Sequence, residues 1–323
     1  MVRSVLLCFH PFSLTGGRSF CPLSTQDACA FYSFLSEDLK RLEQSLAEES
    51  SISLRWSVEA MNLLKRMQIE LLALFKKCKL PIVFGAEEDW FNQYMQETAI
   101  LLDFCNSLKS AISGINRYRL VIDLTLQKIV QGDTMISLEE MDFKHGSSLS
   151  TKMVSMGKDI CLQGNNKADK RIGTVMLAAK CTMIVVSVLL ISAIVSPLPI
   201  NIGSEGLTSK YPQLKPFIEM LNALVARFHE RAVKPKKGSG LVLAEHKMVD
   251  SVVGDLRAQA VKGVEGEDEK ERFLMSAELL RTSSDELREG IEMFDAVVDE
   301  VFEVVINGRN EMLGVFREHV YVN

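Results

Sequence analysis

The chain has 323 residues, of which 47% are hydrophobic and 24% are charged, so it can bury a substantial core. Its 42 acidic residues outnumber its 37 lysines and arginines, and the formal net charge of -5 argues against a protein that coats nucleic acid with a basic surface. With 8 prolines, 19 glycines and 15 methionines, the composition favours long helices with adaptable apolar seams. We therefore predict an all-α fold without a nucleic-acid partner.

Residues 1–30 are predicted to form a tail outside the helical core. Before its first acid, this segment contains Arg3, Arg18 and several serines and threonines, a composition similar to that of an organelle transit peptide. Pro11 interrupts any amphipathic helix early, and the apolar residues 5–7 are too few for a secretory signal. Both a disordered tail and a cleaved plastid peptide stay open as interpretations.

Residues 31–131 are predicted to form a region of long helices. Apolar residues recur at spacings of three and four through three successive segments. Pro81 ends the second segment. The third keeps its period from Phe91 to Ile129, which predicts a helix of about forty residues, or ~60 Å. Helices with such stripes pack lengthwise, so we expect an elongated bundle.

Residues 172–196 are the most apolar part of the chain, and they allow two interpretations. The segment contains one charge, Lys180, and the sixteen uncharged residues after it end at Pro197. Sixteen residues span ~24 Å, less than the ~30 Å of a bilayer's hydrocarbon core, whereas a span of the whole segment would place Lys180 deep in the membrane. The segment is therefore either a candidate membrane span or a central bundle helix that is buried on all sides.

The remaining segments complete the expected bundle. Residues 132–171 lose the helical period and gather Gly, Ser, Asp and Lys, which predicts a flexible connection. Residues 208–323 regain it, with two helices within 214–262 and a long last element that follows the charged residues 265–272 and whose seam Gly308 interrupts. We expect these helices to pack back antiparallel on the N-terminal ones. The predicted core positions are Leu64, Leu71, Leu101, Leu108, Ile112, Phe294, Val298 and Val305.

No motif in the sequence indicates catalysis or a bound cofactor. None of the 5 histidines has a glutamate three residues before it, as a di-metal site in a helical bundle requires. No phosphate-binding G-x-x-x-x-G-K-S/T loop and no G-x-S-x-G turn occurs. The 7 scattered cysteines, never spaced C-x-x-C, predict neither a disulfide framework nor a zinc site. We predict no catalytic, cofactor-binding or metal-binding residue, and no enzymatic activity.

Two short features are candidates for contact or regulation. Lys234, Lys236 and Lys237 form a basic patch that suits either anionic lipid headgroups or a solvated linker. Arg281 stands three residues before Ser284, a spacing that either marks a phosphorylation site at a helix junction or is a chance match.

Several stretches of the sequence together carry a family resemblance. They are LRWSVEAMNLL, KLPI, EEDWFNQYMQETAILLDFCNSLKSAI and, near the C-terminus, VVDEVFEVVINGRNEML. The pattern comprises a helix led by Trp56, a break at Leu80-Pro81, an acidic start at Asp89-Trp90 and the hexapeptide Leu101-Leu102-Asp103-Phe104-Cys105-Asn106. From Phe31 onward, most of the chain resembles the plant BYPASS family.

The resemblance implies a regulator of plant root and shoot development that restrains a mobile root-derived signal which arrests shoot growth. The family has no established catalytic residue, so the resemblance adds no site. We expect a non-enzymatic protein that acts through protein partners and is either cytoplasmic or membrane-associated through residues 172–196, with the plastid and the endoplasmic reticulum as further locations. The alternatives are a helical scaffold or adaptor in stress or secretory signalling and, ranked third, a small-molecule binder or enzyme of the signal pathway.

Overall fold

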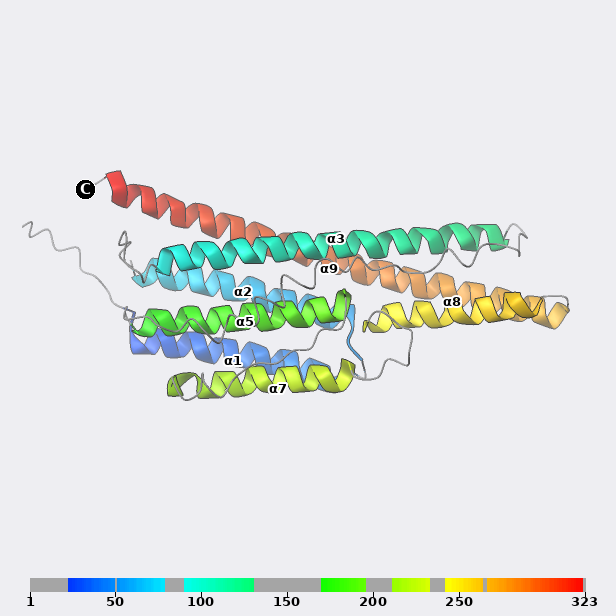
Figure 1. Cartoon of the computed structure of the whole chain (residues 1–323), viewed down its shortest axis with the longest axis horizontal. Helices are drawn as coiled ribbons and strands as arrows, with labels where there is room; N and C mark the ends of the chain where they lie inside the picture. Colours follow the sequence, from blue (N-terminus) through cyan, green and yellow to red (C-terminus); the bar gives the residue numbers. More distant parts are fainter. Residues whose placement is uncertain are drawn as a thin grey trace, which may run out of the picture.

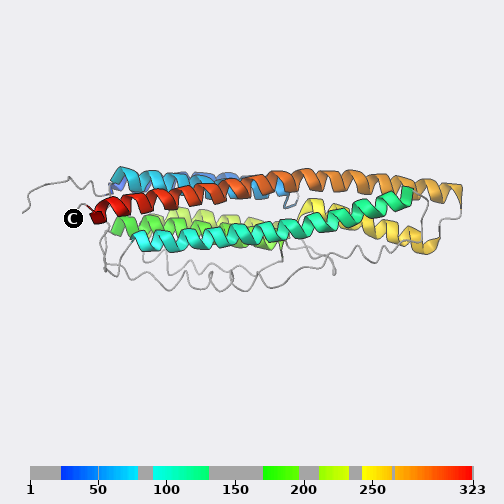
Figure 2. The same cartoon turned by 90° about the horizontal axis from the view of Figure 1, so that it is seen from above.

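The computed structural model describes residues 23–49, 51–78, 90–130, 170–195, 211–232, 242–263 and 266–321. Within these ranges the chain forms seven α-helices and one short 3-10 helix, with no strand. The helices lie lengthwise in a rod (Figures 1 and 2), so the predicted all-α, elongated bundle is confirmed. Most of the predicted tail and nearly all of the predicted connection lie outside the described residues.

The first two helices, α1 (Thr25–Glu48) and α2 (Leu54–Cys78), form an antiparallel hairpin. Helix α1 begins six residues before the predicted start, so the tail prediction is wrong for residues 25–30. The reason is a capped N-terminus: the Ser24 side chain accepts a hydrogen bond from the Asp27 backbone N–H at 3.0 Å. Asp27 also places a negative charge in the first turn, where the helix dipole favours it.

Two long helices run along the rod and extend through both of its halves (Figure 1). Helix α3 (Trp90–Val130) has 41 residues, as its period predicts, whereas α9 (Glu267–Tyr321) has 55 residues and includes most of the charged stretch that was expected to precede it. Three acids of that stretch, Glu267, Asp268 and Glu269, occupy the first turn of α9, where the helix dipole favours them. Gly308 does not interrupt α9. A Cβ atom there would lie 2.7 Å from the Tyr94 hydroxyl, so the glycine lets α3 and α9 approach closely.

Helix α5 (Lys170–Ile194) is the central helix of the bundle. It contacts α1, α2, α3 and α7 (Lys215–Ala232), the last of which follows the 3-10 helix η2 (Pro212–Leu214). By length and composition α5 can cross a membrane, yet 89% of its most apolar window is buried inside the bundle. Every residue from Cys181 to Val195 is buried.

Helix α8 (Ala244–Lys262) meets α2 head to head (Figure 1). The Ala244 backbone N–H donates to the Ile52 carbonyl at 2.8 Å, and the Leu54 backbone N–H donates to Glu245 Oε1 at 2.9 Å. The Glu245 carboxylate thus lies where the positive ends of two helix dipoles meet. This junction divides the rod. We call α1, α2, α5 and α7, with the adjoining halves of α3 and α9, the body, and α8 with the other halves the arm.

The predicted core is confirmed, since all eight predicted positions are at most 3% exposed. Helices α3 and α9 run antiparallel as expected, with Lys109 Nζ 2.6 Å from Asp295 Oδ1. Helices α2 and α9 run parallel, with Lys65 Nζ 2.6 Å from Glu300 Oε2, because both run opposite to α3.

Candidate functional site

An open groove with a volume of about 530 Å³ runs between α1 and α2. We call it the α1–α2 groove. Its lining side chains repeat at spacings of three and four along both helices, so the groove follows their length. They are Asp38, Arg41, Leu42, Gln44, Ser45, Glu48 and Glu49 on one side, and Arg55, Glu59, Asn62, Leu63 and Arg66 on the other. None of these residues was predicted from the sequence to be part of a site.

Asp38 is the buried charge of the α1–α2 groove, with its side chain only 1% exposed. Its Oδ2 lies 2.8 Å from Arg66 Nη2, and its Oδ1 lies 3.2 Å from Arg41 Nη2. Burial of a carboxylate is costly unless cations and donors compensate it, and the two arginines supply that compensation. Because their side chains stay 44% and 60% exposed, both guanidinium groups can also reach a ligand in the groove.

The rim of the groove carries charges of both signs. Arg55 Nε lies 3.9 Å from Glu59 Oε1, and Glu49 Oε2 accepts a hydrogen bond from the Ser53 hydroxyl at 2.6 Å. Exposed pairs of this kind contribute little to stability, but they discriminate between partners by the order of their charges. The groove therefore suits a polar peptide or helix of mixed charge better than a polyanion.

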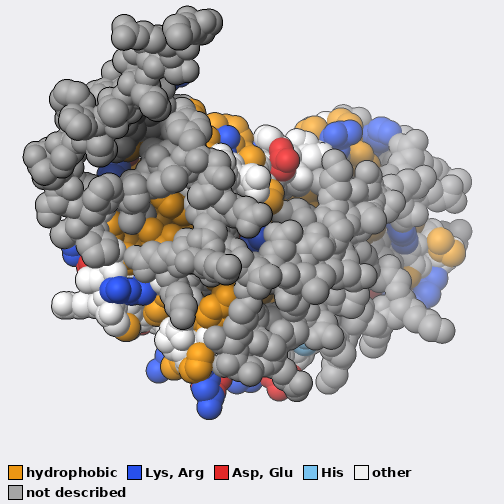
Figure 3. Space-filling model, turned by 60° about the vertical axis from the view of Figure 1, so that its left-hand side comes forward, with side chains coloured by type: hydrophobic (Ala, Val, Ile, Leu, Met, Phe, Trp, Pro, Cys, Tyr) orange, Lys and Arg blue, Asp and Glu red, His pale blue; other side chains and the backbone are white. Residues whose placement is uncertain are grey.

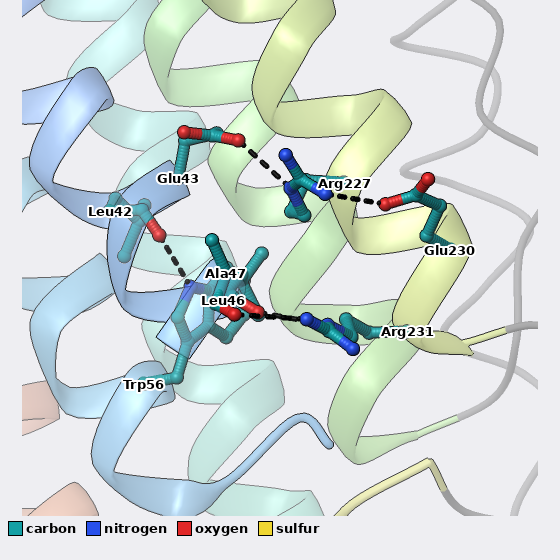
Figure 4. A network of polar contacts seen from close by, with 8 residues as sticks. All are labelled: Leu42, Glu43, Leu46, Ala47, Trp56, Arg227, Glu230 and Arg231. Carbon is teal, nitrogen blue, oxygen red and sulfur yellow. Dashed lines mark hydrogen bonds and ion pairs between the residues drawn. The ribbon is translucent and has the colours of Figure 1, made fainter. Parts of the chain in front are cut away.

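The end of α1 beside the groove is held in place by donors from α2 and α7 (Figure 4). The Trp56 indole N–H donates to the Leu42 carbonyl at 3.2 Å. Arg231 donates from Nε to the Leu46 carbonyl at 2.9 Å and from Nη2 to the Ala47 carbonyl at 3.0 Å. The last carbonyl groups of a helix have no partner within the helix, so the two Arg231 bonds fix the final turn of α1, and the Trp56 bond joins α2 to the turn before it. A rigid wall of this kind is a suitable frame for binding.

The residues of the family pattern lie mainly in the core. Trp56 is fully buried, with its ring centroid 5.4 Å from that of Phe228. In the hexapeptide that ends at Asn106, the side chains of Leu101, Phe104 and Cys105 are buried. Burial raises the pKa of the Cys105 thiol to about 12, so at neutral pH the group is a protonated, unreactive thiol. Trp56 holds α2 in the bundle and the hexapeptide residues hold α3, all of them by packing.

A second polar cluster lies between α3 and α5. The Glu97 carboxylate accepts a hydrogen bond from Gln93 at 2.8 Å, and burial raises its pKa to about 7, although the positive charge of Lys180 opposes that rise. Lys180 is the one charge in residues 172–196, so an acid on α3 partly compensates it. A cavity of about 10 Å³ beside this cluster is too small for a ligand.

A third polar cluster joins α3 to α8 in the arm. The Tyr118 hydroxyl donates to Asp250 Oδ1 at 2.8 Å, and His246 Nδ1 lies 3.2 Å from Asp250 Oδ2. The Tyr118 and His246 rings stack with centroids 5.4 Å apart. Burial acts to raise the pKa of Asp250, but the bonds and charges of His246, Tyr118 and Arg257 outweigh it and hold the pKa below its usual value. The cluster clamps two helices together, with the imidazole covered by the phenol ring.

The two short features found in the sequence have different outcomes. Ser283 and Ser284 are 4% and 2% exposed, so the phosphorylation interpretation is wrong for the folded chain, because no kinase reaches side chains buried in a helix interface. The basic patch of Lys234, Lys236 and Lys237 lies outside the described residues. Among the residues that the structure does describe, no group of three or more His, Cys, Asp or Glu side chains is placed to hold a metal ion.

Scans of protein-family models, of curated proteins and of solved structures found no match to this chain.

On the face shown in Figure 3, the described Lys and Arg side chains lie at separate places among hydrophobic and uncharged ones. Among the sites described above, the α1–α2 groove thus remains the best candidate for binding.

Proposed function

We propose that the chain is a non-enzymatic regulator of plant root and shoot growth, similar in role to the BYPASS proteins, which restrains a mobile root-derived signal by binding partner proteins. The observation that carries the protein-binding part is the α1–α2 groove, an open, charged surface on a rigid hairpin. The developmental part rests on the sequence resemblance.

The groove fits a partner segment that carries acidic and basic side chains in turn. The carboxylates of such a segment would bind the exposed guanidinium groups of Arg41 and Arg66, and its bases would bind Glu48 and Glu59. From Asp38 to Glu48 the groove follows ten residues of α1, or ~15 Å, which corresponds to about three turns of a bound helix. Charge order then determines which partner binds.

Within this proposal α5 acts as the core helix of a soluble chain in the cytoplasm. To enter a membrane, α5 would have to leave α1, α2, α3 and α7, and their apolar faces would then be exposed to water. Membrane attachment through α5 is the competing account. Fractionation of the tagged chain separates the two accounts, since a membrane span resists extraction by alkaline carbonate.

The proposal is tested by restoring growth in plants that lack this chain. In the groove variant, Arg55→Glu is combined with Glu59→Arg, which keeps an i,i+4 pair but reverses the order of charge at the rim. In the matched control, Lys215→Glu is combined with Glu219→Lys on α7, another exposed i,i+4 pair, outside the groove. We expect the wild-type chain and the control to restore shoot growth and the groove variant to fail.

Two outcomes would contradict different parts of the proposal. If the groove variant restores growth as well as the control does, the groove is not the binding surface. If the wild-type chain itself leaves shoot growth arrested, the developmental role is wrong. Mass spectrometry of native purified chain addresses the enzyme or small-molecule alternative, which a stoichiometric bound metabolite would favour.

A further inference from the structure

The arm exposes more apolar surface than the body. Among the described residues, nine large hydrophobic side chains are exposed, and seven of them lie on α8 or on the arm halves of α3 and α9. The other two, Ile69 on α2 and Met293 on α9, belong to the body, because α9 reaches the start of α2 at Gly290. Large exposed apolar side chains that gather in one region mark an interaction surface. The remaining question is which partner fits it.

One edge of the arm, where α3 meets α9, combines apolar and charged side chains. Lys109 of α3 marks this edge, because its Nζ lies 2.6 Å from Asp295 and 2.7 Å from Asp299. Leu120 follows Lys109 by about three helical turns and lies on the same side of α3, with Leu124 one turn further. The two leucines are 53% and 58% exposed. We call this edge the α3–α9 edge.

On α9 the same edge carries a regular stripe of charge. Spacings of three and four lead back from Asp299 and Asp295 through Glu292, which lies 3.6 Å from Arg288, to a set of four alternating charges: Arg288, Asp285, Arg281 and Glu278. Their side chains are between 37% and 63% exposed. Within the chain they pair along the helix, with Arg288 Nη2 3.2 Å from Asp285 Oδ1 and Arg281 bound to Glu278.

This stripe is its own complement. When a second copy of α9 runs in the opposite direction about residue 283, Glu278 meets Arg288 and Arg281 meets Asp285, so each acid faces a base. Leu120 and Leu124 are likewise symmetric, about residue 122 of α3. Residue 122 is thirteen positions after Lys109, and residue 283 is twelve positions before its partner Asp295, so the two centres lie within about one residue of each other along the rod. A single two-fold axis therefore fits both helices.

We propose that the protein forms a two-fold symmetric dimer in which the α3–α9 edge of one arm packs antiparallel on the same edge of a second copy. Leu120 of each chain then covers Leu124 of the other, which removes both from water. The charges favour this register, since a slip by one charge along the stripe would bring like charges together and a slip by two would leave some charges of the set unpaired. A dimer requires the α9 charges and the α3 leucines to be symmetric about a common axis, whereas an unrelated partner would not. The dimer does not depend on the proposed function.

Analytical ultracentrifugation of the full chain tests this proposal in a dilution series from micromolar to nanomolar. Arg281→Glu with Arg288→Glu makes the stripe wholly acidic, and Glu278→Arg with Asp285→Arg makes it wholly basic. We expect a dimer for the wild-type chain and a monomer for each variant, with at least tenfold weaker association. An equimolar mixture of the two variants should regain a dimer, because each acid then faces a base again. Such recovery is impossible if the substitutions unfold the chain.

The apolar part of the edge has its own control. Leu120→Asp with Leu124→Asp should abolish the dimer, whereas Ile69→Asp, at an exposed apolar position on α2, should leave it intact. A wild-type chain that stays monomeric at micromolar concentration would overturn the proposal. So would a dimer that survives either charge reversal or the leucine substitutions, or a mixture of the two charge variants that remains monomeric.

Discussion

The body and the arm of the rod bury their apolar residues in different ways. In the body, α5 is surrounded by four helices, and its residues from Cys181 to Val195 are all buried. Among the described residues of the arm, α8 and the two long helices surround no central helix, and side chains such as Leu124 and Leu279 stay more than half exposed. A layer of three helices leaves every helix an outward face, whereas a surrounded helix has none.

The comparison teaches that α3 and α9 have different roles along their length: their body halves stabilise the fold, and their arm halves carry the contact surface. In the body, α9 presents Phe294, Val298 and Val305 to the core, and in the arm it carries the self-complementary charges described above. We expect the free energy of unfolding to reside mainly in the body, since most completely buried side chains lie there. Substitutions in the body should therefore change folding, and equivalent ones on the arm surface should change association.

The largest effect is expected in α5. Val186→Arg with Leu190→Arg places two unpaired charges at positions that are 0% exposed, at roughly 3 to 5 kcal/mol each, enough to unfold a domain of ordinary stability. Met275→Arg with Leu279→Arg, at exposed arm positions, should stay within ~0.5 kcal/mol of wild type. Urea unfolding of purified chains measures both. If the α5 variant folds normally, and the wild-type chain is found only in the membrane fraction after alkaline carbonate extraction, α5 is a membrane span.

The next effect concerns Glu97, whose burial raises its pKa to about 7. Because the folded chain favours the protonated carboxyl, this group destabilises the fold increasingly as pH rises from ~4.5, the pKa of an unfolded glutamate, through 7. Glu97→Gln keeps the neutral shape, so at pH 8 it should stabilise the chain by up to ~3 kcal/mol, and near pH 4 the gain should vanish. Urea unfolding across that pH range would contradict the assignment if the difference from wild type were constant.

Two glycine-to-alanine substitutions in α9 should have smaller effects on the free energy of unfolding, and the effects should be opposite in sign. Gly308→Ala forces a Cβ atom to within 2.7 Å of the Tyr94 hydroxyl in the packed body, which should cost ~1 to 3 kcal/mol. Gly314→Ala, six residues further along α9, has open space around its Cβ and should gain ~0.5 to 1 kcal/mol from higher helix propensity. Thermal unfolding measures both. Equal changes in the melting temperature would show that α3 and α9 do not approach closely at Gly308.

Local patterns in the sequence were sufficient to predict the helices and the core. The three-four spacing from Phe91 to Ile129 predicts α3 closely, because the apolar face of a packed helix must repeat with the helix itself. The start of α9 was missed, since Glu267 and its neighbours carry no apolar period and are stabilised by the helix dipole instead. Gly308 does interrupt the apolar seam, but the reason for a glycine there could not be predicted, because a close approach between helices leaves no local signal.

The candidate site could not be predicted in the same way. Arg66 stands on a charged stripe that looks like any solvated face, and its partner Asp38 is 28 positions away on another helix. Lys180 stood out in the sequence as the one charge of its segment, but nothing singled out Glu97 among the 42 acidic residues as the acid near it. Such pairs depend on the order and direction in which helices pack, which periodicity alone does not determine.

The smallest effect compares two buried tyrosine hydroxyls, one in the arm and one in the body. In the arm, Tyr118 donates to the charged carboxylate of Asp250 at 2.8 Å, and in the body the hydroxyls of Tyr32 and Thr174 lie 2.6 Å apart. Each Tyr→Phe change removes one hydrogen bond, at ~1 to 2 kcal/mol near pH 7. The two variants should nevertheless differ in their dependence on pH, which urea unfolding at a series of pH values would measure.

The difference follows from the charge of the acceptor. The pKa of Asp250 is held below its usual value in the folded chain. Its carboxylate therefore contributes its full stabilisation above pH ~4, where an aspartate of the unfolded chain is also ionised. That stabilisation is lost as the pH falls through the lower pKa of the folded state. The cost of Tyr118→Phe should therefore shrink in acid. The cost of Tyr32→Phe should stay constant, because the Thr174 hydroxyl does not titrate. A Tyr118→Phe cost that persists unchanged below pH 3 would show that the phenol packs in the arm without stabilising the Asp250 carboxylate.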